Sequence, residues 1–402
     1  MYNYVSKIIF ALITLLSFQV CNSQIRTEQF NKNLKSISKK SILPGFSVTI
    51  LKNDSIYFQN GYGFAEKKLK KKYTLETIQP IGSISKTIIG FSIMKCIDLG
   101  YFTLDTDINT ILPFKIQNPN FPNSIITIKD LATHTSSLID NEATYLSLYS
   151  VGEKPLLKLG SFLNEYYSKE GKFYSLSNFG TFEPGKEYNY SNIASSLASY
   201  IIELKSGLSF EAFTKKYIFD PIKMNDSHWF YDKSKSEHYA TLYEINKTDI
   251  TYLKPFLNKD NSVKIYSCIT YSDGSLKTST QDLTKYTLEM IKGFYGTSNL
   301  LSKESYSTLF QKQFSEENMP LNMDVKEPNR AVFWCYSKKG KLIHTGSDIG
   351  VTAFLSFDPI TKIGRIIMIN AALDGEKNDK AVKDFMKIIG EIEKFEATLN
   401  EN

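Results

Sequence analysis

Apolar and polar residues alternate over residues 46–50, a pattern typical of a half-buried β-strand. Phe46, Val48 and Ile50 alternate with polar neighbours, and an extended pattern resumes over residues 56–58 after a turn at residues 53–54, which predicts a β-hairpin. Toward the other end, further strands are predicted over residues 332–336, 341–345, 351–357 and 365–370.

Helical spacing of apolar residues dominates most of the chain between these strands. It predicts helices over about 83–99, 128–134, 192–207 and 210–217, one more after Ser279, and one toward each chain end over about 24–41 and 379–396. An aromatic-rich connection over about 141–182 forms either packing between helices or a lid over a substrate, and we favour packing for most of its rings. Residues 228–262 are polar and irregular and predict no element.

Strands at both ends with helices between them predict an α+β fold. We expect an antiparallel sheet built from both chain ends, flanked by helices, with a mostly helical subdomain inserted into it. The sheet subdomain is predicted at about 24–82 and 270–398, and the helical subdomain at about 83–269, within one domain over 24–402.

The helix predicted over 83–99 begins with a pattern that can carry chemistry, Ser-x-x-Lys at Ser83 and Lys86. Positions three apart are neighbours on a helix, so the hydroxyl and the amine can touch. A serine becomes a nucleophile when a base lies within hydrogen-bond reach, and a lysine in an apolar pocket can serve as that base. The same pattern at Ser36 and Lys39 lies in a polar, lysine-rich segment with nothing apolar to bury the amine.

Residues 1–23 have the features of a secretory leader, with Lys7 near the start, an apolar stretch over 8–20 and small residues after it. We therefore expect an exported protein, periplasmic or secreted, with no stable membrane span after leader removal. A lipid anchor on Cys21 is the less favoured alternative, because Val20 is bulkier than a lipoprotein signal usually allows.

The net charge of +6 comes partly from lysine clusters at 35–40 and 67–72. These clusters lack interleaved aromatic residues, so we interpret them as solvated faces and expect no nucleic-acid partner. The four histidines are far apart without ligand spacing, and we expect neither a metal site nor a cofactor. Beyond the leader, Cys96 is predicted to lie in the core, and a disulfide between Cys268 and Cys335 stays open.

Two further motifs follow in chain order: Tyr190-Ser191-Asn192 behind a Pro-Gly turn, and His344-Thr345-Gly346 on a predicted strand. With Ser-x-x-Lys, they make the sequence similar to the serine β-lactamase and penicillin-binding protein family. The resemblance is to the branch of cephalosporinase-type β-lactamases, D-Ala-D-Ala carboxypeptidases, D-aminopeptidases and esterases. It covers nearly the whole chain after the leader and implies a β-lactamase/transpeptidase-like fold and a serine hydrolase.

The resemblance implies how the reaction would be divided among the residues. Ser83 would attack a carbonyl and form an acyl-enzyme, while Lys86 and Tyr190 would share the proton transfer, either of them being the base. The backbone N–H groups of Ser83 and Ser347 would hold the oxyanion.

Substrate-binding roles are implied for Asn192, His344, Thr345 and Gly346. Relatives commonly place a lysine where this chain has His344, and a histidine is largely neutral at pH 7. We therefore expect the site to bind a substrate carboxylate weakly, which favours an esterase or a peptidase for D-amino-acid derivatives over a β-lactamase. The substrate would be a small molecule or a peptidoglycan-like peptide. The alternative is a penicillin-binding cell-wall sensor with little turnover.

Overall fold

The structure, a computed structural model, describes residues 24–245, 251–373 and 379–400, so the predicted leader lies outside the described residues. The chain divides into two compact units, one holding the two terminal helices and the other running from Pro44 to Asp374. The predicted subdomain boundaries near 82 and 270 both fall inside the larger unit.

The smaller unit contains a helix over residues 24–40 and helix α10 (Lys380–Asn400). Phe30 and Phe395 stack with their ring centroids 4.2 Å apart, and Leu34 is fully buried. The apolar stripes predicted from helical spacing therefore face each other, and both terminal helices are confirmed.

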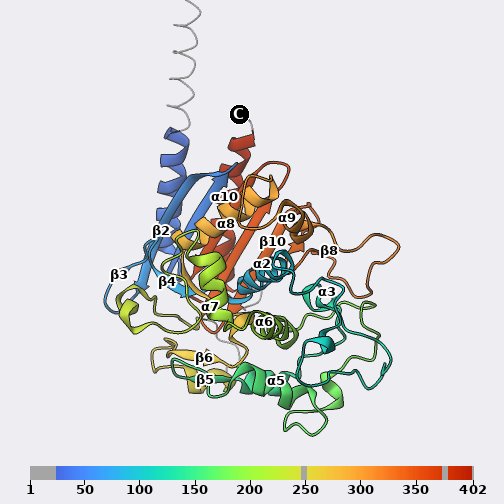
Figure 1. The fold of residues 1–402 in the computed structure, drawn as a ribbon. Helices are drawn as coiled ribbons and strands as arrows, with labels where there is room; N and C mark the ends of the chain where they lie inside the picture. The colour runs from blue at the N-terminus through green and yellow to red at the C-terminus, as the bar shows by residue number, and fades with distance from the viewer. Residues whose placement is uncertain (1–23, 246–250, 374–378, 401–402) are drawn as a thin grey trace, which may run out of the picture. The chain divides into compact units, whose positions relative to one another are not determined.

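The larger unit is built on an antiparallel sheet to which both sequence ends contribute (Figure 1). Within the described residues it has eight strands in the order β3-β2-β1-β12-β11-β10-β9-β8. The strands are β1 (Gly45–Lys52), β2 (Ser55–Glu66), β3 (Lys71–Lys72), β8 (Asn329–Arg330), β9 (Cys335–Tyr336), β10 (Leu342–Asp348), β11 (Val351–Asp358) and β12 (Ile363–Ile369). The predicted fold class, with one sheet drawn from both ends, is confirmed.

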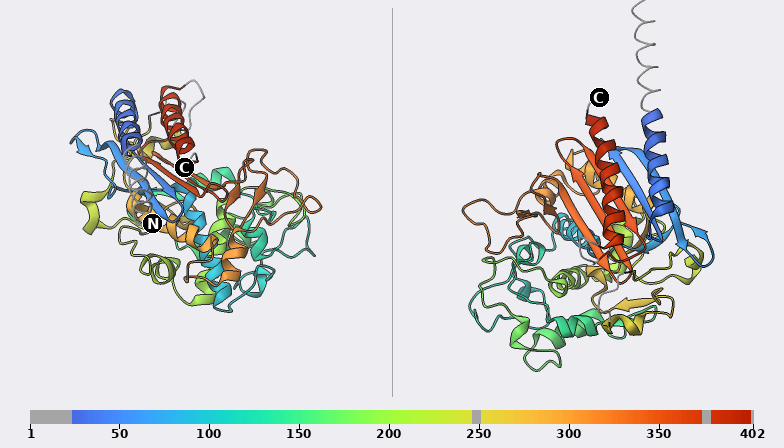
Figure 2. Two further views of the ribbon diagram at one scale, coloured as in Figure 1. Left: turned by 90° about the horizontal axis from the view of Figure 1, so that it is seen from above. Right: turned by 180° about the vertical axis from the view of Figure 1, so that it is seen from behind.

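The strands from the early and the late part of the sequence join where β1 pairs with β12, as both views in Figure 2 show. Phe46 lies opposite Ile369 and Val48 opposite Ile367 in this register. The polar positions between them are buried too, because helix α8 packs on β1 and β12. The Ser47 hydroxyl, for example, shares a hydrogen bond of 2.7 Å with that of Thr280 at the start of α8.

The strand predicted over 332–336 is confirmed only at residues 335–336, which form β9, and is wrong over 332–334. The chain makes two short strands, β8 and β9, joined by a tight turn in which the Ala331 N–H donates to the Trp334 carbonyl oxygen. Phe333 has a φ of 53°, which a strand does not allow. These apolar residues are buried by core packing on all sides, and such a run cannot be distinguished from a strand by its pattern alone.

Helices flank the sheet and fill the inserted region (Figure 1). Helix α2 is packed between α6 and α9, which explains why it is apolar around most of its circumference. The helices are α2 (Ser85–Asp98), α3 (Ile128–Ala132), α4 (Glu142–Ser147), α5 (Leu159–Tyr167), α6 (Asn192–Ser206), α7 (Phe210–Thr214), α8 (Thr280–Phe294) and α9 (Lys303–Phe310). Two small sheets pair β4 (Ile78–Pro80) with β7 (Lys277–Ser279) and β5 (Tyr149–Val151) with β6 (Tyr266–Cys268).

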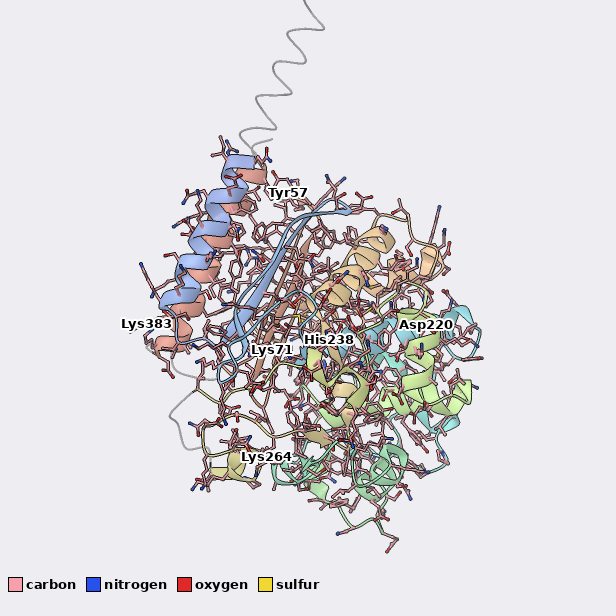
Figure 3. The ribbon with its side chains drawn as sticks, turned by 90° about the vertical axis from the view of Figure 1, so that its left-hand side faces the viewer. Tyr57, Lys71, Asp220, His238, Lys264 and Lys383 are labelled. Carbon is pink, nitrogen blue, oxygen red and sulfur yellow. The ribbon has the colours of Figure 1, made fainter. Side chains whose placement is uncertain are left out.

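Most rings of the aromatic-rich connection pack in the core, as predicted, with Tyr166 and Tyr167 forming an edge-to-face pair. Cys96, Cys268 and Cys335 are all buried free thiols, so the open disulfide does not form. At the surface, Lys71 donates to the carbonyl oxygens on either side of the exposed His238 (Figure 3). Among the residues the structure describes, no helix combines the length and apolarity needed to cross a bilayer.

Candidate active site

Ser83 lies in a single 3₁₀ turn, η1 (Gly82–Ile84), directly before helix α2. This turn packs against the end of strand β10, and the two backbones approach so closely that glycine is required on both sides. A Cβ on Gly82, whose φ is +55°, would lie 2.6 Å from the Ser347 nitrogen, and a Cβ on Gly346 would overlap the Ile81 carbonyl oxygen. The contact therefore fixes the backbone of Ser347 beside that of Ser83.

Lys86 is fully buried one turn along the chain from Ser83. Its Nζ lies 3.1 Å from Ser83 Oγ, 2.7 Å from Asn192 Oδ1 and 2.8 Å from the Asp273 carbonyl oxygen. The amide and carbonyl oxygens are acceptors only, so they engage two N–H groups of Lys86. The remaining position on Nζ faces the Ser83 hydroxyl, which allows proton transfer between the two groups.

Tyr190 places its ring beside the same amine, with the ring centroid 4.9 Å from Lys86 Nζ. The ring stacks on the imidazole of His134 at a centroid distance of 4.3 Å and is 36% exposed. His134 Nδ1 accepts the backbone N–H of Ser191 at 3.2 Å. Burial lowers the pKa of His134 well below its ordinary value, with the positive charges of nearby residues adding to the effect, so a neutral ring supports the tyrosine.

Asp140 is a residue of this site that the sequence analysis missed. Its carboxylate accepts the Ser191 hydroxyl at 2.6 Å, the Asn192 N–H at 2.7 Å and the Ile193 N–H at 3.0 Å. These groups form the start of helix α6, where N–H groups have no partner within the helix. Burial raises the pKa of Asp140, and these hydrogen bonds oppose the rise. Asp140 thus fixes Asn192, which in turn contacts Lys86.

The motif on β10 alternates between two faces of the strand. His344 and Gly346 are buried, whereas Thr345 and Ser347 are exposed. Burial, together with the nearby charges of Lys86 and Arg330, lowers the pKa of His344 to about 3, and the ring is neutral at pH 7 as predicted.

A cavity of about 330 Å³ opens beside Ser83. The predicted residues Tyr190, Asn192 and Ser347 line it as well, so the structure brings residues from three distant motifs to one opening. His344, Thr345 and Gly346 are absent from its lining. His344 and Gly346 lie on the buried face of the strand, whereas Thr345 shares the exposed face with Ser347. Their substrate-binding role stays a prediction.

The remaining walls come from segments whose role the sequence analysis did not foresee. Tyr145 and Tyr149, from the aromatic-rich connection, form one wall, in line with a lid role for some of its rings. Tyr252 and Phe256, from the segment that predicted no element, form another. A short apolar turn within a polar, irregular stretch gives no periodic signal, so nothing in the sequence indicated this wall.

Three acidic residues complete the lining, Glu244, Asp273 and Asp348. Burial raises the pKa of Asp273 to about 7, and the charge of Lys86 opposes this rise. Burial likewise raises the pKa of Asp348 to about 6. Over residues 24–245, 251–373 and 379–400, no three His, Cys, Asp or Glu side chains are placed to hold a metal ion.

The sequence profile described as Beta-lactamase matches residues 30–385, and the chain therefore belongs to the β-lactamase family. The resemblance inferred from the three motifs is confirmed at this level.

Among its relatives is protein flp of Staphylococcus aureus (strain N315), 25% identical over 347 residues that cover 85% of this chain and 63% of flp. Penicillin-binding protein 4* of Bacillus subtilis (strain 168) is 26% identical over 246 residues, which cover 60% of this chain and 51% of that protein. The chain thus spans less than two thirds of the length of these curated relatives. The solved structure of EstCE1, a hydrolase with promiscuous acyltransferase activity, matches with a TM-score of 0.69 at 17% identity, covering 92% of this chain and 99% of that one, and shares the fold.

Proposed function

We propose that the protein is an exported serine hydrolase that forms an acyl-enzyme on Ser83 and acts on an ester, a D-amino-acid amide or peptide, or a β-lactam. The observation that carries this proposal is the 3.1 Å contact between Lys86 Nζ and Ser83 Oγ at the opening of a cavity. A hydroxyl this close to a buried amine has a base for its proton and an open space for an acyl group.

In the acylation step, Ser83 Oγ attacks the substrate carbonyl carbon and its proton passes to Lys86 or Tyr190. The oxyanion that forms is held by the backbone N–H groups of Ser83 and Ser347, which contribute about 3 kcal/mol per donor in other acyl-transfer enzymes. The proton then moves to the leaving oxygen or nitrogen as its bond to the acyl carbon breaks.

Deacylation repeats the same steps with water in place of the serine. The water gives a proton to the same base, its oxygen attacks the acyl carbon, and Ser83 leaves with the proton returned to it. Asn192 would hydrogen-bond the substrate while its side-chain oxygen keeps Lys86 in place.

Export rests on the leader pattern over residues 1–23 and on membership of a family that includes penicillin-binding relatives. Expression of the full chain in a bacterial host, followed by fractionation and mass spectrometry of the amino terminus, tests it. Cleavage near residue 23 is expected, and an intact leader on cytoplasmic protein would contradict export.

A fluorophosphonate probe tests the nucleophile. The purified protein should be labelled once, on Ser83, and Ser83→Ala should abolish labelling. Ser36→Ala is a matched control because Ser36 begins the second Ser-x-x-Lys pattern but lies exposed on the helix over 24–40. Labelling of any other serine would refute the assignment.

A substrate panel then separates hydrolysis from sensing. Nitrocefin, a p-nitrophenyl ester and a D-Ala-D-Ala peptide cover the classes named above, and a hydrolase should turn over at least one of them many times. A penicillin-binding sensor would instead keep its acyl group for hours and release no product.

A further inference from the structure

The charged residues that line the cavity beside Ser83 all carry the same sign. Glu244 and Asp273 are buried and Asp348 is half-buried, and no lysine or arginine is among the described lining residues. Lys86, the nearest base, lies beneath the lining with its Nζ engaged by three oxygens.

A backbone hydrogen bond to Lys86 holds Asp273 at the end of the cavity where Ser83 lies. The Asp273 carbonyl oxygen accepts an N–H of Lys86 Nζ at 2.8 Å, and the residue is only 2% exposed. The carboxylate meets the Tyr145 hydroxyl at 3.4 and 3.5 Å and a hydrogen bond from Thr270. The contacts to Tyr145 are too long to offset the loss of hydration of a buried carboxylate.

Asp348 approaches the same point from strand β10. Its Oδ2 would lie 3.9 Å from a Cβ on Gly274, the residue after Asp273. Lys277, whose charge acts to lower the pKa of Asp348, donates its Nζ to the carbonyl oxygens of Trp229 and Ser275 at 3.1 and 3.2 Å. Lys277 is thus engaged with backbone oxygens, and the described lining residues include no lysine or arginine to form an ion pair with either aspartate.

Aromatic rings from Tyr145, Tyr149 and Phe256 line the cavity together with these aspartates and form what we call the tyrosine wall. Tyr145 and Tyr149 meet edge to face at 5.9 Å, and Tyr149 and Phe256 do so at 6.5 Å. Aromatic faces attract alkylammonium groups, and carboxylates attract them more strongly. A substrate carboxylate would instead meet three acids, and the neutral His344 offers it no charge.

We propose that the substrate carries an alkylammonium group on its acyl side, which binds between the carboxylates of Asp273 and Asp348 against the tyrosine wall. This inference rests on the proposed function, because it assumes that the acyl group enters the cavity from Ser83. It places cationic esters or amides first among the substrate classes, ahead of β-lactams and peptides that end in a free carboxylate.

Matched esters test the proposal. One is the p-nitrophenyl ester of γ-(trimethylammonio)butanoic acid, and the other has a tert-butyl group in place of trimethylammonio, which keeps the shape and removes the charge. After correction for spontaneous hydrolysis, kcat/KM should be about tenfold higher or more for the cationic ester. The p-nitrophenyl half-ester of adipic acid, which is anionic, should be the poorest of the three.

Variants show whether the two aspartates cause the preference. Asp273→Asn and Asp348→Asn should each lower the ratio of cationic to neutral kcat/KM at least about threefold, and the double variant should bring it close to one. Asp220→Asn is the matched control, because Asp220 is an exposed surface aspartate (Figure 3) and the substitution changes the net charge equally. An unchanged ratio in both cavity variants, or a wild-type ratio of one or less, would overturn the proposal.

A binding measurement keeps this inference separate from the proposed function. Calorimetry on Ser83→Ala, which cannot form an acyl-enzyme, would compare the amides of the same two acids. Tighter binding of the cationic amide that is lost in the Asp273→Asn background supports the inference even if no ester is hydrolysed. If both amides bind equally and the native protein hydrolyses the neutral ester, the proposed ammonium site is refuted while the proposed hydrolase activity is supported.

Discussion

The carboxylate of Asp140 accepts the backbone N–H of Asn192 at 2.7 Å. The side-chain oxygen of Asn192 in turn accepts a hydrogen bond from Lys86 Nζ, and Lys86 contacts Ser83. A partly buried carboxylate that is not itself among the lining residues thereby sets the position of the amine beside the nucleophile. Asp140 is a positioning residue in this arrangement, acting through the first turn of helix α6.

Replacing Asp140 should separate positioning from folding. Asp140→Asn puts an amide where an acceptor is needed, so at least one of the Ser191 O–H, Asn192 N–H and Ile193 N–H groups loses its partner, at a cost of about 1–3 kcal/mol. We expect kcat for ester hydrolysis to fall about tenfold or more while KM changes little, because the loss affects the alignment of Lys86.

Asp130→Asn is the matched control for this experiment. Asp130 also caps a helix from a partly buried position, accepting the Thr127 N–H at 2.8 Å, and its other side-chain hydrogen bonds in the described structure go to the hydroxyls of Thr127 and Thr135 and not to Lys86 or Asn192. It should lower the melting temperature with little effect on kcat. If both variants lose stability and activity in the same proportion, Asp140 has only a structural role.

Substitutions at Lys86 and Tyr190 should show which group takes the serine proton. Tyr190→Phe keeps the ring that stacks on His134 and faces Lys86, and removes only the hydroxyl. Because the Lys86 amine already contacts Ser83, Lys86→Met should slow fluorophosphonate labelling by about 100-fold or more, and Tyr190→Phe should slow it by about tenfold or less. The reverse order in stopped-flow labelling would identify the phenol as the base.

The sheet and the helices were predictable because their signals are local. Val48 belongs to an alternating run and Ile367 to a short apolar run, and the stripe that buries Leu34 repeats at helical spacing. The candidate nucleophile and base were also predictable, since Ser83 and Lys86 lie three positions apart before an apolar helix. The turn around Phe333 was not, because its apolar residues are buried without alternation.

The rest of the site depends on contacts between distant segments. Asp140 lies 52 positions before the N–H it accepts from Asn192, and no motif links the two. Asp273 is 187 positions from Lys86, which it meets through a backbone oxygen that any residue could supply. The acidic lining of the cavity therefore became apparent only once the fold had placed Asp273 beside Asp348.

The preference for a cationic ester should depend on pH. The pKa of Asp273, raised mainly by burial, is about 7, and that of Asp348 is about 6. Both carboxyls lose protons as the pH rises from 5 to 8, so the ratio of cationic to neutral kcat/KM should rise over this range. Ionisations of the nucleophile and base cancel in the ratio, and trimethylammonio does not titrate.

Other ionisable groups face these two carboxyls and shape the profile. The charges of Lys86, Asp140 and Asp348 act on Asp273, and that of Lys277 acts on Asp348. Both aspartates raise the pKa of Tyr149 and Cys268, Asp273 alone that of Tyr145, and Asp348 alone that of Tyr266. The profile should therefore be broader than a single titration. Asp273→Asn should remove its upper part, and a ratio that stays flat from pH 5 to 8 in the native protein would contradict the assignment.

The same carboxyl should cost stability at high pH. Since the pKa of Asp273 is about 7 in the folded protein and 3.8 for the free group, the folded state binds its proton more tightly between these values. The stability it contributes is present below about pH 4 and is lost as the pH rises toward 7. The free energy of unfolding of Asp273→Asn, relative to that of the native protein, should therefore rise by on the order of 2 kcal/mol from pH 5 to pH 8. Urea unfolding of both proteins at the two pH values measures this, and a constant difference between them would argue against a buried, strained carboxylate.

Gly346 tests the backbone contact that places Ser347 beside Ser83. Because a Cβ here would overlap the Ile81 carbonyl oxygen, Gly346→Ala must push strand β10 away from turn η1. We expect a loss of about 1–3 kcal/mol in stability and, because the Ser347 N–H moves with the strand, a fall in kcat of about 100-fold. Gly390→Ala in helix α10 is the control, since nothing lies within 4 Å of its added Cβ and alanine favours a helix by about 1 kcal/mol. Thermal melts and ester kinetics on both variants decide the matter: a Gly346→Ala protein that melts and reacts like the native one would show that this contact does not align the oxyanion donor.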